Sequence, residues 1–136
     1  MKRLPFFLLF LFSMSVFAQE KKYRIVYDLV SADTADFSTV VRQFNNILKV
    51  QPEAELELVC HGPALAMLMK EKSNVTEGME ALRQRAKVSF KACANSMRRM
   101  KVEASQLLPL ADIVPVAILE LAERQMEGWS YIKAGH

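Results

Sequence analysis

Strand-like and helix-like segments alternate along residues 23–134, and this alternation restricts the fold more than any other feature. Runs rich in β-branched and aromatic residues are each followed by a stretch in which apolar residues recur every three or four positions. Strands separated by helices are joined by crossover connections, which produce a mainly parallel sheet covered by helices. The sequence therefore predicts an α/β fold, a three-layer α/β/α sandwich around a mainly parallel five-stranded sheet.

The element boundaries follow from turn residues and from changes of period. Strands are expected at residues 23–30, 54–62, 88–94, 113–116 and 129–134. Helices are expected at residues 37–48, 64–72, 95–104 and 116–128, and residues 73–86 are expected to form a loop followed by a helix with Thr76 as its candidate cap. Lys91 is awkward in the third strand, because a strand in the middle of a parallel sheet is covered on both faces. Either its ammonium group reaches an edge of the sheet, or one subunit leaves that face partly uncovered.

The first residues, "MKRLPFFLLFLFSMSVFAQE", have the layout of a secretory signal peptide. Lys2 and Arg3 precede an apolar run, and Val16 and Ala18 are the small residues expected before a cleavage point. A retained membrane anchor is the alternative, but the apolar run is shorter than the roughly 20 residues that cross a bilayer. We therefore expect residues 1–18 to be removed, which leaves a periplasmic or secreted domain without stable membrane insertion.

Charge argues against a nucleic-acid partner. The full chain has a formal net charge of +3, but two of its positive charges, Lys2 and Arg3, lie in the predicted signal peptide. Residues 19–136 then form one domain with a net charge near +1. Proteins that bind nucleic acid usually carry a strongly basic surface, so we exclude that class.

The chain has two cysteines, Cys60 and Cys93, and an exported protein could join them in a disulfide. We do not expect this bridge, because the second and third strands of such sheets are often separated by the first. The spacing of the two cysteines matches no zinc pattern, so we expect no metal. The sequence also lacks a phosphate-binding glycine loop and an HExxH motif, and we expect no cofactor.

Cys93 stands where the third strand meets a helix, at the edge of the sheet where ligands of parallel sheets collect. The unpaired N–H groups in the first turn of a helix stabilise a thiolate, which is the nucleophilic form of cysteine. The sequence is equally consistent with an inert, buried Cys93. His61 and Gly62 end the second strand, and Asn95 and Ser96 follow Cys93, so all four are candidate ligand-binding residues on the same rim.

The segments "LELVCHGPALAML", "VSFKACANSMRRM" and "LLPLADIVPVAILELAERQMEGWSYIK", in this order, resemble the DsrE/DsrF-like family of sulfur-relay proteins. The likeness is nearest to an exported, uncharacterised branch in which a strand ends in His-Gly. It implies the α/β/α fold and assembly into dimers, trimers or hexamers. It also implies that Cys93 matches the cysteine that carries sulfur as a persulfide, with a donor or acceptor protein as partner.

Two functions follow. In the first, Cys93 accepts a sulfane sulfur and passes it on, while His61 and the N–H groups near Asn95 and Ser96 stabilise the charged sulfur. In the second, the protein is a non-catalytic, oligomeric module that binds a small ligand or partner, and Cys93 is incidental packing. Whether the protein is an enzyme is left open by the sequence.

Overall fold

The computed structural model describes Met1 and residues 20–136, and the signal peptide predicted for residues 1–18 falls almost wholly outside them. Five parallel strands form one sheet in the order β4-β3-β2-β1-β5. Their bounds are β1 Arg24–Leu29, β2 Glu55–Cys60, β3 Lys87–Cys93, β4 Ala111–Val114 and β5 Ser130–Ala134. The α-helices are α1 Thr34–Val50, α2 Thr76–Arg85, α3 Ala94–Met100 and α4 Ala117–Met126, and the 3₁₀ helices are η1 Gly62–Leu68 and η2 Ala104–Gln106.

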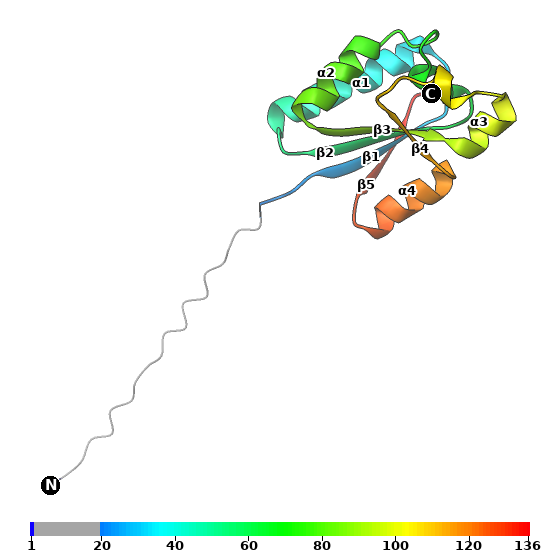
Figure 1. Cartoon of the computed structure of the whole chain (residues 1–136). Coiled ribbons are helices and arrows are strands. Elements are labelled where there is room, and N and C mark those ends of the chain that lie inside the picture. The colour runs from blue at the N-terminus through cyan, green and yellow to red at the C-terminus, as the bar shows by residue number, and fades with distance from the viewer. Residues whose placement is uncertain (2–19) are drawn as a thin grey trace.

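Helices lie on both faces of the sheet, which confirms the predicted α/β architecture (Figure 1). Helices α1 and α2 cover one face, where Phe37, Phe44 and Phe90 are completely buried in the larger core. Helix α4 covers the other face, and α3 lies at the carboxyl end of the strands (Figure 1). Helix α1 begins three residues before the expected start at Phe37, because the side chain of Asp33 caps it by accepting from the Ala35 amide over 2.8 Å.

Three expectations need correction. Strands β2 and β3 are neighbours, with Cys60 opposite Ala92, so β1 does not separate them.

The helix expected at residues 64–72 is instead the 3₁₀ helix η1, which ends at Leu68. Nearly all of η1 is buried, so it has no polar face of the kind that an amphipathic surface helix presents to water. Strand β4 runs from Ala111 to Val114 and ends before Pro115, which has no N–H to offer a strand ladder.

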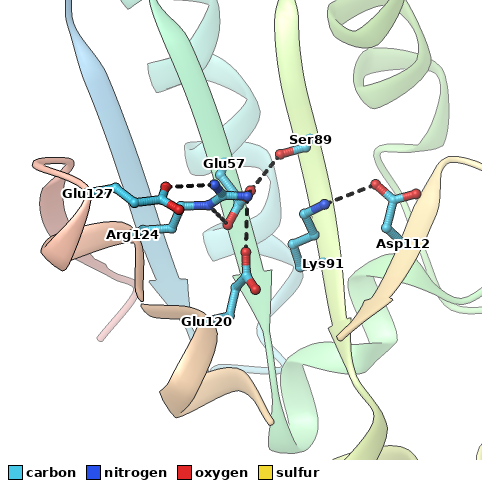
Figure 2. Close-up of polar contacts among 7 residues, drawn as sticks. All are labelled: Glu57, Ser89, Lys91, Asp112, Glu120, Arg124 and Glu127. Carbon is cyan, nitrogen blue, oxygen red and sulfur yellow. Dashed lines mark hydrogen bonds and ion pairs between the residues drawn. The ribbon is translucent and has the colours of Figure 1, made fainter. Parts of the chain in front are cut away.

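The face under α4 is the more polar of the two. Lys91 points to this face and pairs with Asp112 on β4, with 3.2 Å between Nζ and Oδ2. The side chain of Lys91 is only 16% exposed, whereas that of Asp112 is 48% exposed. The lysine therefore reaches toward the edge strand β4 (Figure 2).

Candidate functional site

Two helices begin at the sulfur atom of Cys93. Cys93 is the last residue of β3 and the N-cap of α3. Ala117 is the first residue of α4, and its amide donates to Cys93 Sγ over 3.3 Å. The first amides of a helix have no partner within the helix and carry partial positive charge. Cys93 thus lies at two such ends, of which the sequence indicated only the one that follows it directly.

Ser96 connects the sulfur to the loop after β2. Its hydroxyl is buried and accepts a hydrogen bond of 2.8 Å from the amide of Gly62. Because a hydroxyl accepts and donates at once, the Ser96 proton remains free for the sulfur of Cys93. Gly62 adopts a left-handed conformation with φ of +54°, which turns the chain sharply after β2 and aims its amide at Ser96.

These donors change the acidity of the Cys93 thiol. Burial, the largest single influence, raises the pKa of this thiol, because it disfavours the charged form. Hydrogen bonds from the amides of Ser96, Ala117 and Asn95, together with the Ser96 hydroxyl, outweigh burial. The pKa of Cys93 therefore lies below the ordinary thiol value, which favours the nucleophilic thiolate.

The sulfur is nevertheless covered. Cys93 is only 3% exposed and packs with Val26, Val59, Ala117 and Leu121 between the sheet and α4. The first turn of α4 contacts the sulfur, so we expect this turn to move when a reagent reaches it. The environment therefore supports thiolate chemistry, but Cys93 is almost completely covered in the isolated subunit.

His61 lies beside this site and is held by Asp28. The His61 Nε2 atom is 2.8 Å from Asp28 Oδ1. On the other carboxylate oxygen, Oδ2, Asp28 accepts from the Tyr131 hydroxyl over 2.7 Å and from the Lys133 ammonium over 3.1 Å. Burial raises the pKa of Asp28, but the three hydrogen bonds and the Lys133 charge together hold that pKa far below its ordinary value. Asp28 is therefore a buried, permanently ionised acceptor.

The Asp28 cluster was missed at the sequence level, apart from His61 itself. Its signal is an aspartate in the middle of an otherwise apolar strand, "RIVYDL". The partners Tyr131 and Lys133 come from β5, which pairs with β1 in the sheet although it lies at the other end of the chain. Strand alternation then puts Asp28, Tyr131 and Lys133 on the face that also holds Cys93.

Asn95 has a different position from the one expected for a ligand contact. Its side chain is exposed and accepts from Arg98 over 3.2 Å, so it does not point at the sulfur. Its amide donates to the carbonyl of Pro115 over 3.2 Å and joins α3 to the connection before α4. Asn95 thus contributes through its backbone, while Ser96 contributes through backbone and side chain.

Cys60 takes no part in the site. Both cysteines are free. Cys60 is opposite Ala92 in the register, so its side chain points to the α1 and α2 face while the next residue on β3, Cys93, points to the α4 face. The bridge is therefore prevented by the alternation of faces and not by an intervening strand. Complete burial strongly raises the pKa of Cys60, which keeps it an inert thiol.

A buried ion pair anchors α4 over the sheet. Figure 2 shows Arg124 of α4 lying against Glu57 of β2, with two contacts of 3.1 Å and 3.0 Å. Glu57 is 1% exposed and also accepts from Ser89 over 3.0 Å. Arg124 stacks on Trp129 with 5.0 Å to the ring centre. These contacts fix the far half of α4, and the first residue of the same helix lies on the Cys93 sulfur.

Within the part of the chain that the structure describes, no group of three or more His, Cys, Asp or Glu residues is arranged to hold a metal ion. None of the described helices combines the length and the apolar character that crossing a membrane requires.

The model of the DsrE/DsrF-like family matches residues 8–134 of the sequence. The chain belongs to the DsrE/DsrF-like family. A comparison with curated proteins finds no match.

Solved structures agree with this assignment. A protein of unknown function, MTH1491 from Methanobacterium thermoautotrophicum, aligns with a TM-score of 0.76 and 25% identity over 82% of this chain and 99% of its own. A conserved protein of unknown function, BT1422 from Bacteroides thetaiotaomicron, aligns with a TM-score of 0.63 and 13% identity over 81% of this chain and 93% of its own. The ychN protein of E. coli aligns with a TM-score of 0.61 and 16% identity over 84% of this chain and 99% of its own. The likeness to the last two concerns the fold.

Proposed function

We propose that this DsrE/DsrF-like protein is an exported sulfur carrier that holds a sulfane sulfur as a persulfide on Cys93. The observation that carries the proposal is the Ala117 amide, which donates to Cys93 Sγ over 3.3 Å, together with the amide and hydroxyl of Ser96, which also lower the pKa of this thiol. Such donors stabilise negative charge on sulfur, and a persulfide is an anion near neutral pH. An inert core cysteine needs no such set of donors.

The reaction requires no redox partner. The Cys93 thiolate attacks the outer sulfur of a donor persulfide, R–S–SH, and a new sulfur–sulfur bond forms while the old one breaks. The donor leaves as the thiolate R–S⁻, and the protein keeps Cys93–S–SH. Transfer to an acceptor thiolate repeats the same exchange in the opposite direction, so that Cys93 returns to its starting state.

Intact-mass measurement tests the carrier directly. Residues 19–136 are incubated with glutathione persulfide at neutral pH, and the protein is expected to gain the mass of one sulfur atom, which a reductant removes. Cys60→Ala should load equally, and Cys93→Ser should not load. Loading that persists in Cys93→Ser, or wild-type protein that gains no sulfur over a range of pH, would refute the carrier.

The location rests on the first residues. We infer cleavage near Ala18 and release into the periplasm or the medium. The mass of the protein recovered from the periplasmic fraction of a bacterial host should correspond to a chain that begins near Gln19. Recovery of the full-length chain from the membrane fraction would instead support the retained anchor.

A second candidate function, an oligomeric binding module, is favoured by an apolar stripe on α4. Ile118, Leu119 and Met126 are exposed on this helix, at 61%, 58% and 85%. They lie on the side of α4 away from the buried Ala117 and Leu121. Exposed apolar side chains gathered in this way are typical of protein interfaces. We propose that a second copy of this chain covers them.

Light scattering after size-exclusion chromatography tests the assembly. Wild-type residues 19–136 should elute as a dimer, trimer or hexamer, and Leu119→Lys should shift the mass toward the monomer. Glu80→Lys, at an exposed position of α2 on the opposite face of the sheet, is the control and should leave the mass unchanged. A monomeric wild type at high concentration would contradict the proposal.

A further inference from the structure

We infer that His61 moves the proton of the Cys93 thiol during sulfur loading, and that Asp28 is the positioning residue that decides which His61 nitrogen does so. This inference rests on the proposed carrier function and adds a proton path to it.

The strand register brings His61 next to Cys93. Cys60 is opposite Ala92, and the following residue, His61, keeps an extended backbone with φ of −141° and ψ of 165°. Its amide donates to the Leu29 carbonyl over 3.2 Å, so the ladder between β1 and β2 continues to His61. The last pair between β2 and β3 is Cys60 with Ala92, and we infer that one further step in this register puts His61 opposite Cys93, on strands separated by about 4.8 Å. Both side chains then belong to the α4 face.

Asp28 settles the tautomer of His61. A carboxylate that remains ionised can only accept hydrogen bonds, so the His61 Nε2 atom that it contacts must carry a proton. In the neutral ring the lone pair is then on Nδ1, which is free to act as a base. Tyr131 and Lys133 also donate to Asp28 and hold the carboxylate in place. An orienting carboxylate behind a histidine is a common way to fix an imidazole base.

The surroundings of the pair are mixed in charge. Arg99 has its guanidinium close to Gly62, with Nη2 3.7 Å from the place of a β-carbon on that glycine. Lys91, on the same face of the neighbouring strand, is already paired with Asp112. The titratable and charged groups around His61 are Asp28 from β1, Tyr131 and Lys133 from β5, and Arg99 from α3. On the side of Cys93, Lys91 of β3 interacts with Asp112 of β4 and with Glu120 of α4. The Cys60 thiol of β2 lies within the influence of the Asp28 charge.

The proton then follows a closed path during loading. It leaves the Cys93 sulfur for His61 Nδ1, and the thiolate attacks the outer sulfur of the donor persulfide. The leaving thiolate of the donor takes the proton from the imidazolium ring. The ring returns to its neutral tautomer with Nε2–H still on Asp28, so that no proton is gained or lost.

The loading rate with glutathione persulfide as a function of pH tests the inference. At pH 7, His61→Gln and Asp28→Asn should each slow the loading of Cys93 by roughly 10-fold or more. The deficit should disappear at a pH above the thiol pKa, where the thiolate forms without a base. His136→Gln, at the exposed end of the chain, is the control and should load as the wild type does. A purely structural role would give a deficit that is independent of pH, and this result would overturn the inference.

Nitrogen NMR of the unsubstituted protein gives a second readout that needs no variant of the cluster. A long-range proton–nitrogen correlation spectrum should show His61 as the Nε2–H tautomer at neutral pH, with His136→Gln used for assignment. An Nδ1–H tautomer would overturn the inference even if Cys93 loads normally. Wild-type protein that never gains sulfur would contradict the proposed carrier function. The NMR spectrum would still show whether Asp28 fixes the Nε2–H tautomer of His61.

Discussion

The amide of Ala117 points at the sulfur of Cys93 over 3.3 Å, although 24 residues separate them in the sequence. The contact joins the start of α4 to the end of β3 and puts the thiol at the beginning of two helices. It also helps to cover the thiol, so we expect the first turn of α4 to move when a reagent reaches Cys93. The following predictions test this arrangement and the contacts that hold it.

Replacing Ser96 with alanine should raise the pKa of the Cys93 thiol, because it removes one of the donors to the sulfur. Alkylation of Cys93 by iodoacetamide should then require a higher pH, as a rate profile against pH will show. The buried Gly62 amide also loses its partner, which should cost about 1–3 kcal/mol in the free energy of unfolding. Ser105→Ala, at an exposed serine away from the sulfur, should change neither quantity.

Gly62→Ala should lower the free energy of unfolding by about 1 kcal/mol, because only glycine adopts a positive φ without strain. A β-carbon at Gly62 would lie 3.6 Å from Val30 and 3.7 Å from Arg99, so the cost comes from the backbone and not from a clash. Gly62→Asn should cost less, since asparagine tolerates this conformation better. Urea denaturation measures both, and equal costs would contradict the backbone explanation.

Arg124→Leu should destabilise the protein by about 3–5 kcal/mol, because the Glu57 carboxylate is left buried without its partner. Adding Glu57→Gln to this variant should restore much of the loss. Urea denaturation of the single and double variants checks this, with Arg42→Leu on the exposed side of α1 as the control. A double variant no more stable than Arg124→Leu alone would argue against the buried charge as the cause.

Glu120→Gln should raise the melting temperature near neutral pH. Burial, followed by the neighbouring Glu57 carboxylate, raises the pKa of Glu120 above its ordinary value. A carboxyl group with a raised folded-state pKa favours folding at low pH, and this contribution is lost as the pH rises through that pKa. The advantage of Glu120→Gln should therefore shrink toward pH 4. Thermal melts at several pH values check this, and Glu123→Gln should show no such trend.

The fold and part of the site could be predicted because both depend on local pattern. Alternating strands and helices imply a parallel sheet, and the carboxyl-edge rule then assigns Cys93, His61 and Ser96 to one rim. The remaining contacts depend on strand order, which no local pattern encodes. Asp28 acquires Tyr131 only because β5 pairs with β1, 103 positions later in the chain.

The error about the two cysteines has the same origin. Without the strand order, the absence of a Cys60–Cys93 disulfide was attributed to a strand lying between β2 and β3. These two strands are in fact neighbours. The side-chain alternation of a strand is what separates Cys60 from Cys93. The contact between the Ala117 amide and Cys93 could not be predicted for a related reason, because the sequence does not say where a later helix crosses the sheet.

The burial of Cys60 on the far face has a practical consequence. Under native conditions a thiol reagent added to this protein meets one reactive atom, so the first label that enters reports on the lifting of a single helix end. The second label enters only after the sheet itself has come apart. One alkylation time course, followed by mass spectrometry, would therefore record the local opening at Cys93 and the global unfolding that exposes Cys60 in a single experiment.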